Sequence, residues 1–378
     1  MENLFLLVVS LVMFPMIFAV PLLYSDSLLT QNKESGFVSM TTAIIVTVAI
    51  WVFVGYYLSF NQFDTLNFHE DFVNWLIKWA AKPSLSEILN MLVQLDFALY
   101  AVVMFSGTAL AKHTWPFFMI FIPLWLLLVY APLANLIWST SGYLHSVNVL
   151  DFSGGLVVHL AAGVTSLVIA FTVKPVGRSN TKSHDTNYLA TVLIITGWFG
   201  FNLAPVGSIN HLTGLVVLNT LLAIIFGSVG WCLNSYRVEH ILNMENIQNG
   251  ILSGLVTSTA LVGYVPPYGM IATTFISGII SHTVTVYSHK SPYFFDLVDS
   301  FSINAIGGFL GTIGLIIFAN PQINNLGAKG LLTGNVDFAL MEIFGILSTI
   351  VITIVGTIIA HVITMYLIGN IHYKESVQ

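Results

Sequence analysis

Asp151-Phe-Ser-Gly-Gly-Leu-Val-Val-His159 places an acid and a histidine inside an otherwise apolar segment. Eight residues separate the two, a little over two helical turns, so both can lie near one face of a helix. The same spacing recurs 145 residues later, from Asp296 to Asn304. Titratable groups are costly inside a bilayer and usually line a functional interior. The duplication therefore predicts one central pathway lined by two related halves.

The composition indicates a membrane protein. Hydrophobic residues make up 56% of the chain and charged residues 7%, whereas about a quarter of a soluble chain is charged. The mean hydropathy is +0.87. We therefore expect an all-α polytopic protein of the cell membrane, surrounded by a lipid bilayer.

The same composition argues against several other classes. One cysteine, Cys232, excludes an intrachain disulfide and cannot by itself form a thiolate metal cluster. The net charge of −6 is spread along the chain without a basic block, which argues against nucleic-acid binding. The glycine-rich runs contain no P-loop, so no ATP site is expected. We expect neither a cofactor nor a resident metal.

A helix needs about 20 apolar residues to cross a bilayer. The first apolar run, residues 4–23, lacks the positive leading region of a signal peptide and is too long for one, so we interpret it as a retained helix. The hydropathy pattern predicts eleven transmembrane helices, at residues 3–25, 37–60, 87–111, 115–139, 150–173, 187–208, 212–235, 247–266, 268–288, 301–320 and 339–368.

Lysine and arginine predict the orientation, because they are enriched in cytoplasmic loops. An external N-terminus places eight of them in cytoplasmic segments and three in external ones, so we expect a cytoplasmic C-terminus. The cytoplasmic set is Lys33, Lys112, Lys174, Arg178, Lys182, Arg237, Lys290 and Lys374, and the external set is Lys78, Lys82 and Lys329.

In this topology the span that begins at Asp151 runs inward and the span that begins at Asp296 runs outward. Spans 1–5 and 6–10 then form an inverted repeat, a plan common among transporters with a site near the midplane. Gly163 and Gly308, four residues after His159 and Asn304, permit close helix packing, so the two polar residues should meet. The predicted parts are a first repeat at 1–173, a second at 187–320, an eleventh helix at 339–368 and a short cytoplasmic tail at 369–378.

These motifs resemble those of ammonium transporters of the Amt/Mep/Rh superfamily. The segment from Asp151 to His159, with Gly154 and Gly155, is similar to the fifth-span signature of that family. Its sixth-span motif is similar to Gly197-Trp198-Phe199-Gly200-Phe201-Asn202. The similarity covers nearly the whole chain and includes Trp51, Gly55-Tyr56, Trp138 and residues 296–311.

The resemblance implies a homotrimer in which each subunit has its own narrow pore for ammonium, ammonia or methylammonium. Trp138 corresponds to the tryptophan of an outer vestibule that recruits ammonium, and Phe201 to a gate phenylalanine. His159 corresponds to the first of two pore histidines that bond to each other, and Asp151 to a structural acid near the outer face. Trp198, Asn202 and the glycines of the signatures are expected to be structural.

The chain also departs from the family pattern. Asn304 stands where the second pore histidine is expected, and Pro205 where a serine commonly offers an oxygen to the cation. Phe97 lies near the second gate position, although the best register puts Ala98 there. The sequence ends ten residues after the last predicted span. That short tail disfavours tail-mediated docking of a PII-type regulator, which leaves the cytoplasmic loops around 174–185 and 237–245 as candidate contacts.

His159 has a functional and a structural interpretation. A neutral imidazole in a dry pore can accept a hydrogen bond from ammonium, donate one to ammonia or accept a proton in transit. The alternative is a core histidine that a neighbouring helix satisfies. The amide of Asn304 can hold the ring in one tautomer but does not titrate, so a two-histidine proton relay is incomplete. Another ionisable group, or an inactive pore, remains an alternative.

The other candidates have structural alternatives too. Asp151 is expected mainly to cap N–H groups at a helix start, although its field attracts cations. Asp296 should do the same at the inner end, and Asp299 should bond to a neighbouring loop. Trp138 and Phe201 can offer cation–π attraction, or belong to the interfacial belt and to apolar packing.

Asp96, inside the third span, either faces the vestibule and replaces the oxygens lost at Pro205, or bonds internally. The remaining histidines predict no metal site, because none pairs with an acid at helical ligand spacing. They include His113, His184, His240, His282, His289 and His372.

Three classes of function are open at this stage. Channel-like ammonium transport is favoured, because hydrogen bonding to imidazole and loss of a proton distinguish ammonium from potassium of similar size. The missing second histidine keeps an ammonium-sensing receptor, or a pore with altered proton coupling, as alternatives. An intramembrane enzyme would need a nucleophile–base pair or paired metal ligands, which the sequence does not show.

Overall fold

The computed structural model describes residues 1–378 except 26, 29–31, 62–67, 174–182, 325–328 and 378. The described residues form helices and turns and contain no strand. Nine of these helices are long and apolar enough to cross a membrane, and Gly155–Ala170 is a shorter apolar helix. The predicted class, an all-helical multi-pass membrane protein, is confirmed.

The N-terminal part of the chain contains several spans with a π-helical turn inside them, where the helix carries one extra residue. The elements in order are α1 (Glu2–Ser25), α2 (Lys33–Ile50), η2 (Trp51–Gly55), α3 (Tyr56–Phe60), α4 (Phe68–Ala81), α5 (Leu85–Ala109), α6 (Trp115–Trp125), η3 (Leu126–Tyr130), α7 (Ala131–Trp138), α8 (Tyr143–Ser146), η4 (Gly155–Leu160) and α9 (Ala161–Ala170). Of the η elements, η2, η3 and η4 are π-helical.

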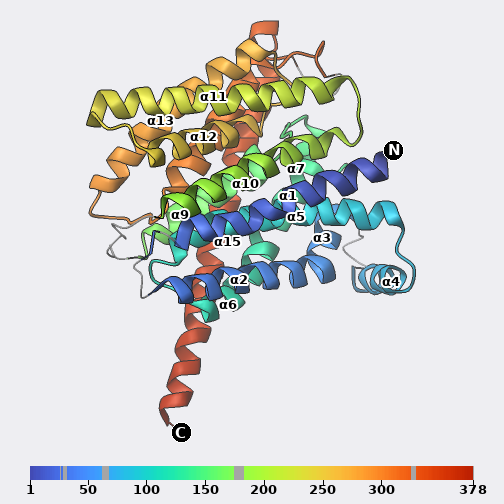
Figure 1. The fold of residues 1–378 in the computed structure, drawn as a ribbon. Helices are drawn as coiled ribbons and strands as arrows, with labels where there is room; N and C mark the ends of the chain where they lie inside the picture. The colour runs from blue at the N-terminus through green and yellow to red at the C-terminus, as the bar shows by residue number, and fades with distance from the viewer. Residues whose placement is uncertain (26, 29–31, 62–67, 174–182, 325–328, 378) are drawn as a thin grey trace.

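The C-terminal part also contains a π-helical segment, η6. Its elements are α10 (His184–Leu203), η5 (Ala204–Val206), α11 (His211–Glu239), α12 (Met244–Ser258), α13 (Pro267–Lys290), η6 (Phe301–Ala305), α14 (Ile306–Phe318), η7 (Leu331–Thr333) and α15 (Val336–Val377). α1 packs against α5 and α10, and the three run side by side in Figure 1. α15 runs across their direction and packs against α6 and α9.

The same local backbone structure follows each of the two acids. A residue with positive φ stands three positions after each acid: Gly154 (φ 102°) after Asp151 and Asp299 (φ 58°) after Asp296. Glycine and aspartate are among the residues that tolerate this left-handed conformation best. A π-helical segment, η4 or η6, comes next in both places. His159 and Asn304 therefore lie in corresponding π-helical segments.

Glycines bring these two segments into backbone contact. A Cβ atom on Gly163 would lie 2.1 Å from the backbone nitrogen of Ala305. Reciprocally, a Cβ atom on Gly308 would lie 2.3 Å from the carbonyl oxygen of Gly155. Only glycine permits such an approach without displacing the backbone. The two segments consequently cross closely enough for side chains on η4 and η6 to touch.

The predicted span 247–266 is wrong at its C-terminal end, because α12 stops at Ser258. The backbone beyond that point bonds to other segments. The N–H of Ser153 donates to the carbonyl of Thr259 at 2.8 Å, and the amide of buried Asn219 donates to the carbonyl of Val262 at 2.9 Å. Non-helical backbone is tolerated at membrane depth where other protein groups form hydrogen bonds with its N–H and C=O groups, as they do here.

Two further observations concern α4 and the C-terminal end of α15. The amphipathic helix α4 was not predicted; its Phe72 and Trp75 pack on Tyr57, with ring centroids 5.2 Å away in each case. The residues predicted as a short tail, 369–378, are helical as far as Val377, because α15 continues to that residue. Three lysine and arginine positions used for the orientation, within 174–182, lie outside the described residues.

Candidate functional site

The crossing of η4 and η6 brings His159 and Asn304 together, as the sequence predicts. His159 Nδ1 lies 2.9 Å from Asn304 Oδ1. Both residues are buried, with 0% and 1% of their surface exposed. The hydrogen bond joins two segments 145 residues apart and supplies each polar side chain with a partner away from water.

Aromatic rings enclose the imidazole of His159. The indole of Trp198 stacks on it with ring centroids 5.4 Å apart and an interplanar angle of 13°. The rings of Phe201 and Tyr100 each lie 5.9 Å away. Tyr100 was missed by the sequence analysis, because one tyrosine in an apolar helix gives no signal of what it faces. The rings leave no part of the imidazole of His159 exposed to solvent.

A second aromatic contact lies next to this enclosure. Phe97 meets Phe201 edge to face with ring centroids 4.5 Å apart, and it lies 5.4 Å from the ring of Trp138. Both phenylalanines are buried. Phe97, which the sequence places near the second gate position, is thus the residue in ring contact with Phe201.

Two cavities border this aromatic layer, and their walls share no residue. We name the first the Trp138 cavity; its wall includes Trp138, Phe97, Gln94, Asn90 and Pro205. The second is the Asn304 cavity, whose wall includes Asn304, Trp198 and Tyr100. Phe97 belongs to the first wall and touches Phe201, while His159 touches both Phe201 and Asn304. The layer of Phe97, Phe201 and His159 thus separates the two cavities.

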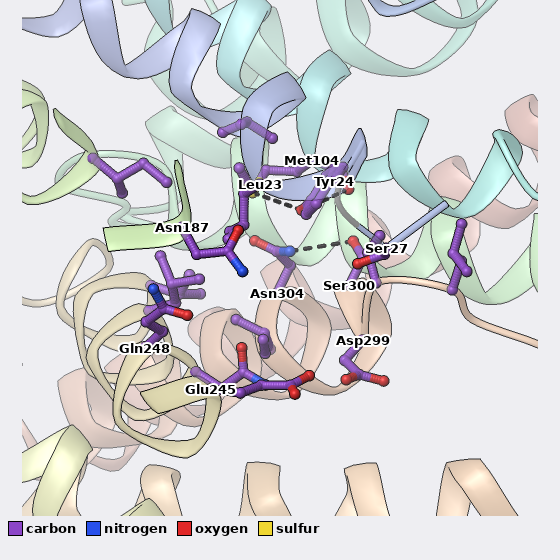
Figure 2. Close-up of a pocket in the computed structure, with 18 of the residues that line it drawn as sticks. Leu23, Tyr24, Ser27, Met104, Asn187, Glu245, Gln248, Asp299, Ser300 and Asn304 are labelled. Carbon is purple, nitrogen blue, oxygen red and sulfur yellow. Dashed lines mark hydrogen bonds between the residues drawn. The ribbon is translucent and has the colours of Figure 1, made fainter. Parts of the chain in front are cut away.

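The Asn304 cavity is rich in polar side chains, which gather around it in Figure 2. Asn187 comes from α10, and Glu245 and Gln248 come from α12. Ser300 and Asn304 also belong to the wall and are joined by a hydrogen bond. The sequence analysis did not single out Asn187 or Gln248, since an isolated amide near a span end resembles a loop residue.

Asp151 acts on the backbone at the start of η4. Its carboxylate accepts hydrogen bonds from the N–H groups of Gly154 (3.1 Å), Leu156 (3.0 Å) and Val157 (2.9 Å). Only 6% of the residue is exposed. Its carbonyl oxygen accepts a hydrogen bond from Trp138 Nε1 at 2.9 Å. The geometry thus fits the capping role and links this acid to the wall of the Trp138 cavity.

Asp296 has an equivalent position at the start of η6. It accepts hydrogen bonds from the N–H of Phe301 and from the hydroxyl of Thr108, both at 2.7 Å. Asp299, expected to bond to a loop, contacts α13: its carboxylate lies 2.5 Å from Nε2 of His289, at the end of that helix.

Asp96, one of the residues expected to recruit ammonium, bonds inside the protein instead of facing the Trp138 cavity. Its carboxylate accepts a hydrogen bond from Ser10 on α1 at 2.6 Å, and it does not belong to the wall of the Trp138 cavity. It is 2% exposed, so internal bonding, the alternative left open above, describes it. A further buried acid, Glu342 on α15, was missed; it accepts a hydrogen bond from the N–H of Leu150 at 2.5 Å.

Asn202, the last residue of the sixth-span motif, holds several segments together. Its Oδ1 accepts a hydrogen bond from Ser153 at 2.9 Å. Its Nδ2 donates to Thr220 at 2.9 Å and to Ser258 at 3.1 Å. Because it is fully buried and bonded on both sides, Asn202 supports the loop before η4 and does not line either cavity.

A multi-pass helical bundle with two cavities separated by a buried layer of aromatic rings and one imidazole is the architecture of a membrane transporter. The chain belongs to the Ammonium Transporter Family, whose model matches residues 4–378. It is 28% identical to the ammonium transporter of Bacillus subtilis, over 97% of this chain and 92% of that protein.

Solved structures show the same fold. The crystal structure of Saccharomyces cerevisiae Mep2 matches with a TM-score of 0.81 and 24% identity, covering 95% of this chain and 84% of that one. A sensor Amt protein matches with a TM-score of 0.83 and 20% identity, covering 97% and 92%. At this level of identity the likeness concerns the fold alone.

Proposed function

We propose that this protein of the cell membrane conducts ammonium, as ammonia with or without a separate proton, through a pore in each subunit. The observation that carries the proposal is the hydrogen bond between His159 and Asn304, buried between the Trp138 cavity and the Asn304 cavity. Membership of the Ammonium Transporter Family supports it.

The architecture that we propose has eleven spans, an external N-terminus and two inverted repeats. Nine long helices, together with Gly155–Ala170 and α12, provide the eleven segments. The matching positive-φ residues and π-helical segments after Asp151 and Asp296 support the repeat. In this arrangement residues 1–173 and 187–320 are the repeats, and the Trp138 cavity faces the outside.

Recruitment takes place in the Trp138 cavity. A cation over an indole or phenyl face gains up to about 2 kcal/mol when it is partly desolvated. Gln94 and Asn90 in the same wall supply amide oxygens, which Pro205 cannot do from its side chain. The cavity can therefore gather ammonium or methylammonium although a vestibule serine is missing.

Passage requires crossing the layer of Phe97, Phe201 and His159. A bare cation loses its hydration there, which is expensive in an apolar environment. Ammonium can transfer one proton to water in the Trp138 cavity and continue as ammonia, whereas potassium has no proton to lose. The neutral ring of His159 offers a hydrogen-bonding partner inside the layer, and the polar side chains around the Asn304 cavity receive the molecule beyond it.

The decisive experiment is uptake of labelled methylammonium by purified protein in liposomes. We expect uptake by the wild type and a strong loss in His159→Leu, with an unchanged His240→Ala as the control, since His240 is exposed at the end of α11. Binding of methylammonium without uptake would instead support the receptor reading, for which the fold of the sensor Amt protein gives a precedent.

The amide of Asn304 sets the proton coupling in this proposal. Because an amide does not titrate, proton movement alongside ammonia should be smaller than with a second histidine. Current and uptake are measured together in liposomes for the wild type and Asn304→His. We expect more current per molecule taken up in the variant, and identical ratios would refute this role.

The proposed assembly is a homotrimer of such subunits. The many large apolar side chains exposed on α11, α13 and α15 of one subunit are suited to contact with lipid or other subunits. Mass measurement of the detergent-solubilised protein tests the trimer. Binding of a PII-type protein to the cytoplasmic loops is tested separately, by co-purification with and without residues 237–245 altered.

A further inference from the structure

Two hydroxyl groups extend the polar contact between His159 and Asn304. The Asn304 amide nitrogen donates to Ser300 Oγ at 3.2 Å (Figure 2). The hydroxyl of Ser166 donates to the same oxygen at 2.8 Å and shares its hydrogen with the carbonyl oxygen of Ala162 at 3.1 Å. Ser166 is 0% exposed and Ser300 1%. Ser166 belongs to α9, and Ser300 stands directly before η6. The hydroxyl pair thus bridges the same two segments as the His159–Asn304 bond.

The series of hydrogen bonds from Ser166 through Ser300 to Asn304 bears on the orientation of the Asn304 amide. A hydroxyl oxygen has two lone pairs, and those of Ser300 accept from Asn304 and Ser166. In the structure the amide nitrogen of Asn304 is directed towards Ser300 Oγ and its carbonyl oxygen towards His159 Nδ1. The two ends of an amide are told apart by such partners rather than by shape.

The orientation of the amide in turn decides the tautomer of the imidazole. A carbonyl oxygen can only accept a hydrogen bond, so the proton between Asn304 Oδ1 and His159 Nδ1 must belong to the ring. The lone pair of a neutral His159 is then on Nε2. That atom is shielded from solvent and has no hydrogen-bond partner among the described residues.

We propose that Ser300 and Ser166 are positioning residues that hold His159 as its Nδ1–H tautomer and so present Nε2 to the pore as a hydrogen-bond acceptor. The ligands that suit such a nitrogen are N–H donors, namely ammonium and methylammonium. The tautomer follows from the contacts alone, while its effect on transport rests on the proposed function. Asn304 needs such neighbours, because without them a half-turn of its amide group would exchange the oxygen and the nitrogen, and either atom could form the hydrogen bond with His159.

The nitrogen-15 spectrum of labelled histidine tests the tautomer directly. Protonated and bare ring nitrogens have different shifts, and the signals of His159 are identified by their loss in His159→Gln. In the wild type at neutral pH we expect a protonated Nδ1 and a bare Nε2. Ser300→Ala frees the amide of Asn304 to turn over, so both tautomers should appear. Ser300→Thr keeps a hydroxyl and should restore the single tautomer.

Ser106→Ala is a matched control. Ser106 is another fully buried serine, and its hydroxyl donates to the carbonyl of Val102 in its own helix at 2.7 Å. This variant removes the same atom and should leave the His159 signals unchanged. Ser166→Ala, which removes one donor to Ser300, should shift the tautomer balance less than Ser300→Ala does.

Methylammonium uptake gives the second measurement. Ser300→Ala should reduce uptake about fivefold, the effect expected from one lost buried hydrogen bond, while Ser106→Ala should not. An Nε2–H tautomer in the wild type, or the same spectrum in Ser300→Ala and wild type, would overturn the proposal. Should Ser300→Ala fold poorly, the spectra of the wild type and Ser166→Ala test the proposal. An Nε2–H tautomer in the wild type, or identical spectra in the two proteins, would overturn it. A protein that takes up no methylammonium but shows the expected spectra contradicts the proposed function and leaves the positioning role standing.

Discussion

Gly163 lies directly against the backbone of Ala305, where an added methyl group would come within 2.1 Å of a peptide nitrogen. The contact holds α9 against η6 immediately beside His159 and Asn304. A shift of the backbone here would change the distance between those two side chains. The glycine therefore matters to the site although it offers no chemical group.

Gly163→Ala should destabilise the protein. Inserting a methyl group into a packed contact costs about 1–3 kcal/mol, and the backbone on the other side cannot rotate away as a side chain can. The midpoint of thermal unfolding of the purified protein measures the effect. Gly214→Ala is the control, because a Cβ atom there meets nothing within 4 Å and Gly214 is exposed on α11. Equal midpoints for Gly163→Ala and wild type would contradict the close crossing.

Trp138→Leu should weaken recruitment more than it slows passage. Losing a cation–π contact in a partly desolvated cavity should raise the apparent KM for methylammonium about tenfold. The maximal rate should change less, since the layer of Phe97 and Phe201 remains. Trp115→Leu replaces a half-exposed tryptophan at the start of α6 and serves as the control. A KM equal to that of the wild type would count against recruitment at Trp138.

Asp151→Asn should lower stability. Each carboxylate oxygen accepts backbone hydrogen bonds, and an amide would turn its NH2 group towards one set of N–H donors. Leaving buried donors unpaired costs about 1–3 kcal/mol. Thermal unfolding measures the loss, compared with Asp185→Asn at an exposed position in the first turn of α10. A stability loss no larger than in the control would show that the capping bonds are dispensable.

Asp96→Asn should leave the affinity for methylammonium unchanged. The carboxylate accepts a hydrogen bond from Ser10, and an asparagine oxygen can accept the same bond. Because Asp96 is not part of the wall of the Trp138 cavity, removing its charge does not alter the immediate surroundings of the recruited cation. Binding or uptake titrations provide the check, and a marked rise in KM would return Asp96 to the recruitment site.

The parts of the fold and site that the sequence predicted depend on spacing within one segment. The eight-residue interval from Asp151 to His159 and the matching interval to Asn304 predicted two helical segments and the meeting of their polar residues. Gly163 and Gly308 predicted a close crossing. These inferences succeed because helix geometry fixes which residues share a face, and because small residues have one main use between packed helices.

The features that the sequence did not predict depend on hydrogen-bond partners far away in the sequence. The unwound backbone after Ser258 is tolerated because Asn219, on another helix, bonds to its carbonyls, and hydropathy cannot show that. Glu342 looks like a surface acid until the N–H of Leu150 is placed beside it. Ser166 and Ser300 resemble ordinary small helix residues in the sequence, because their bond links positions 134 residues apart.

The indole of Trp138 is anchored by the main-chain carbonyl of Asp151, whose side chain also organises the first turn of η4. Any change that disturbs the path of the chain at Asp151 will tilt the tryptophan as well. Impaired uptake at low ammonium concentration in such a variant would then resemble the loss of an attracting charge. Its origin would be a displaced ring, and a crystal structure of the variant would reveal the tilt.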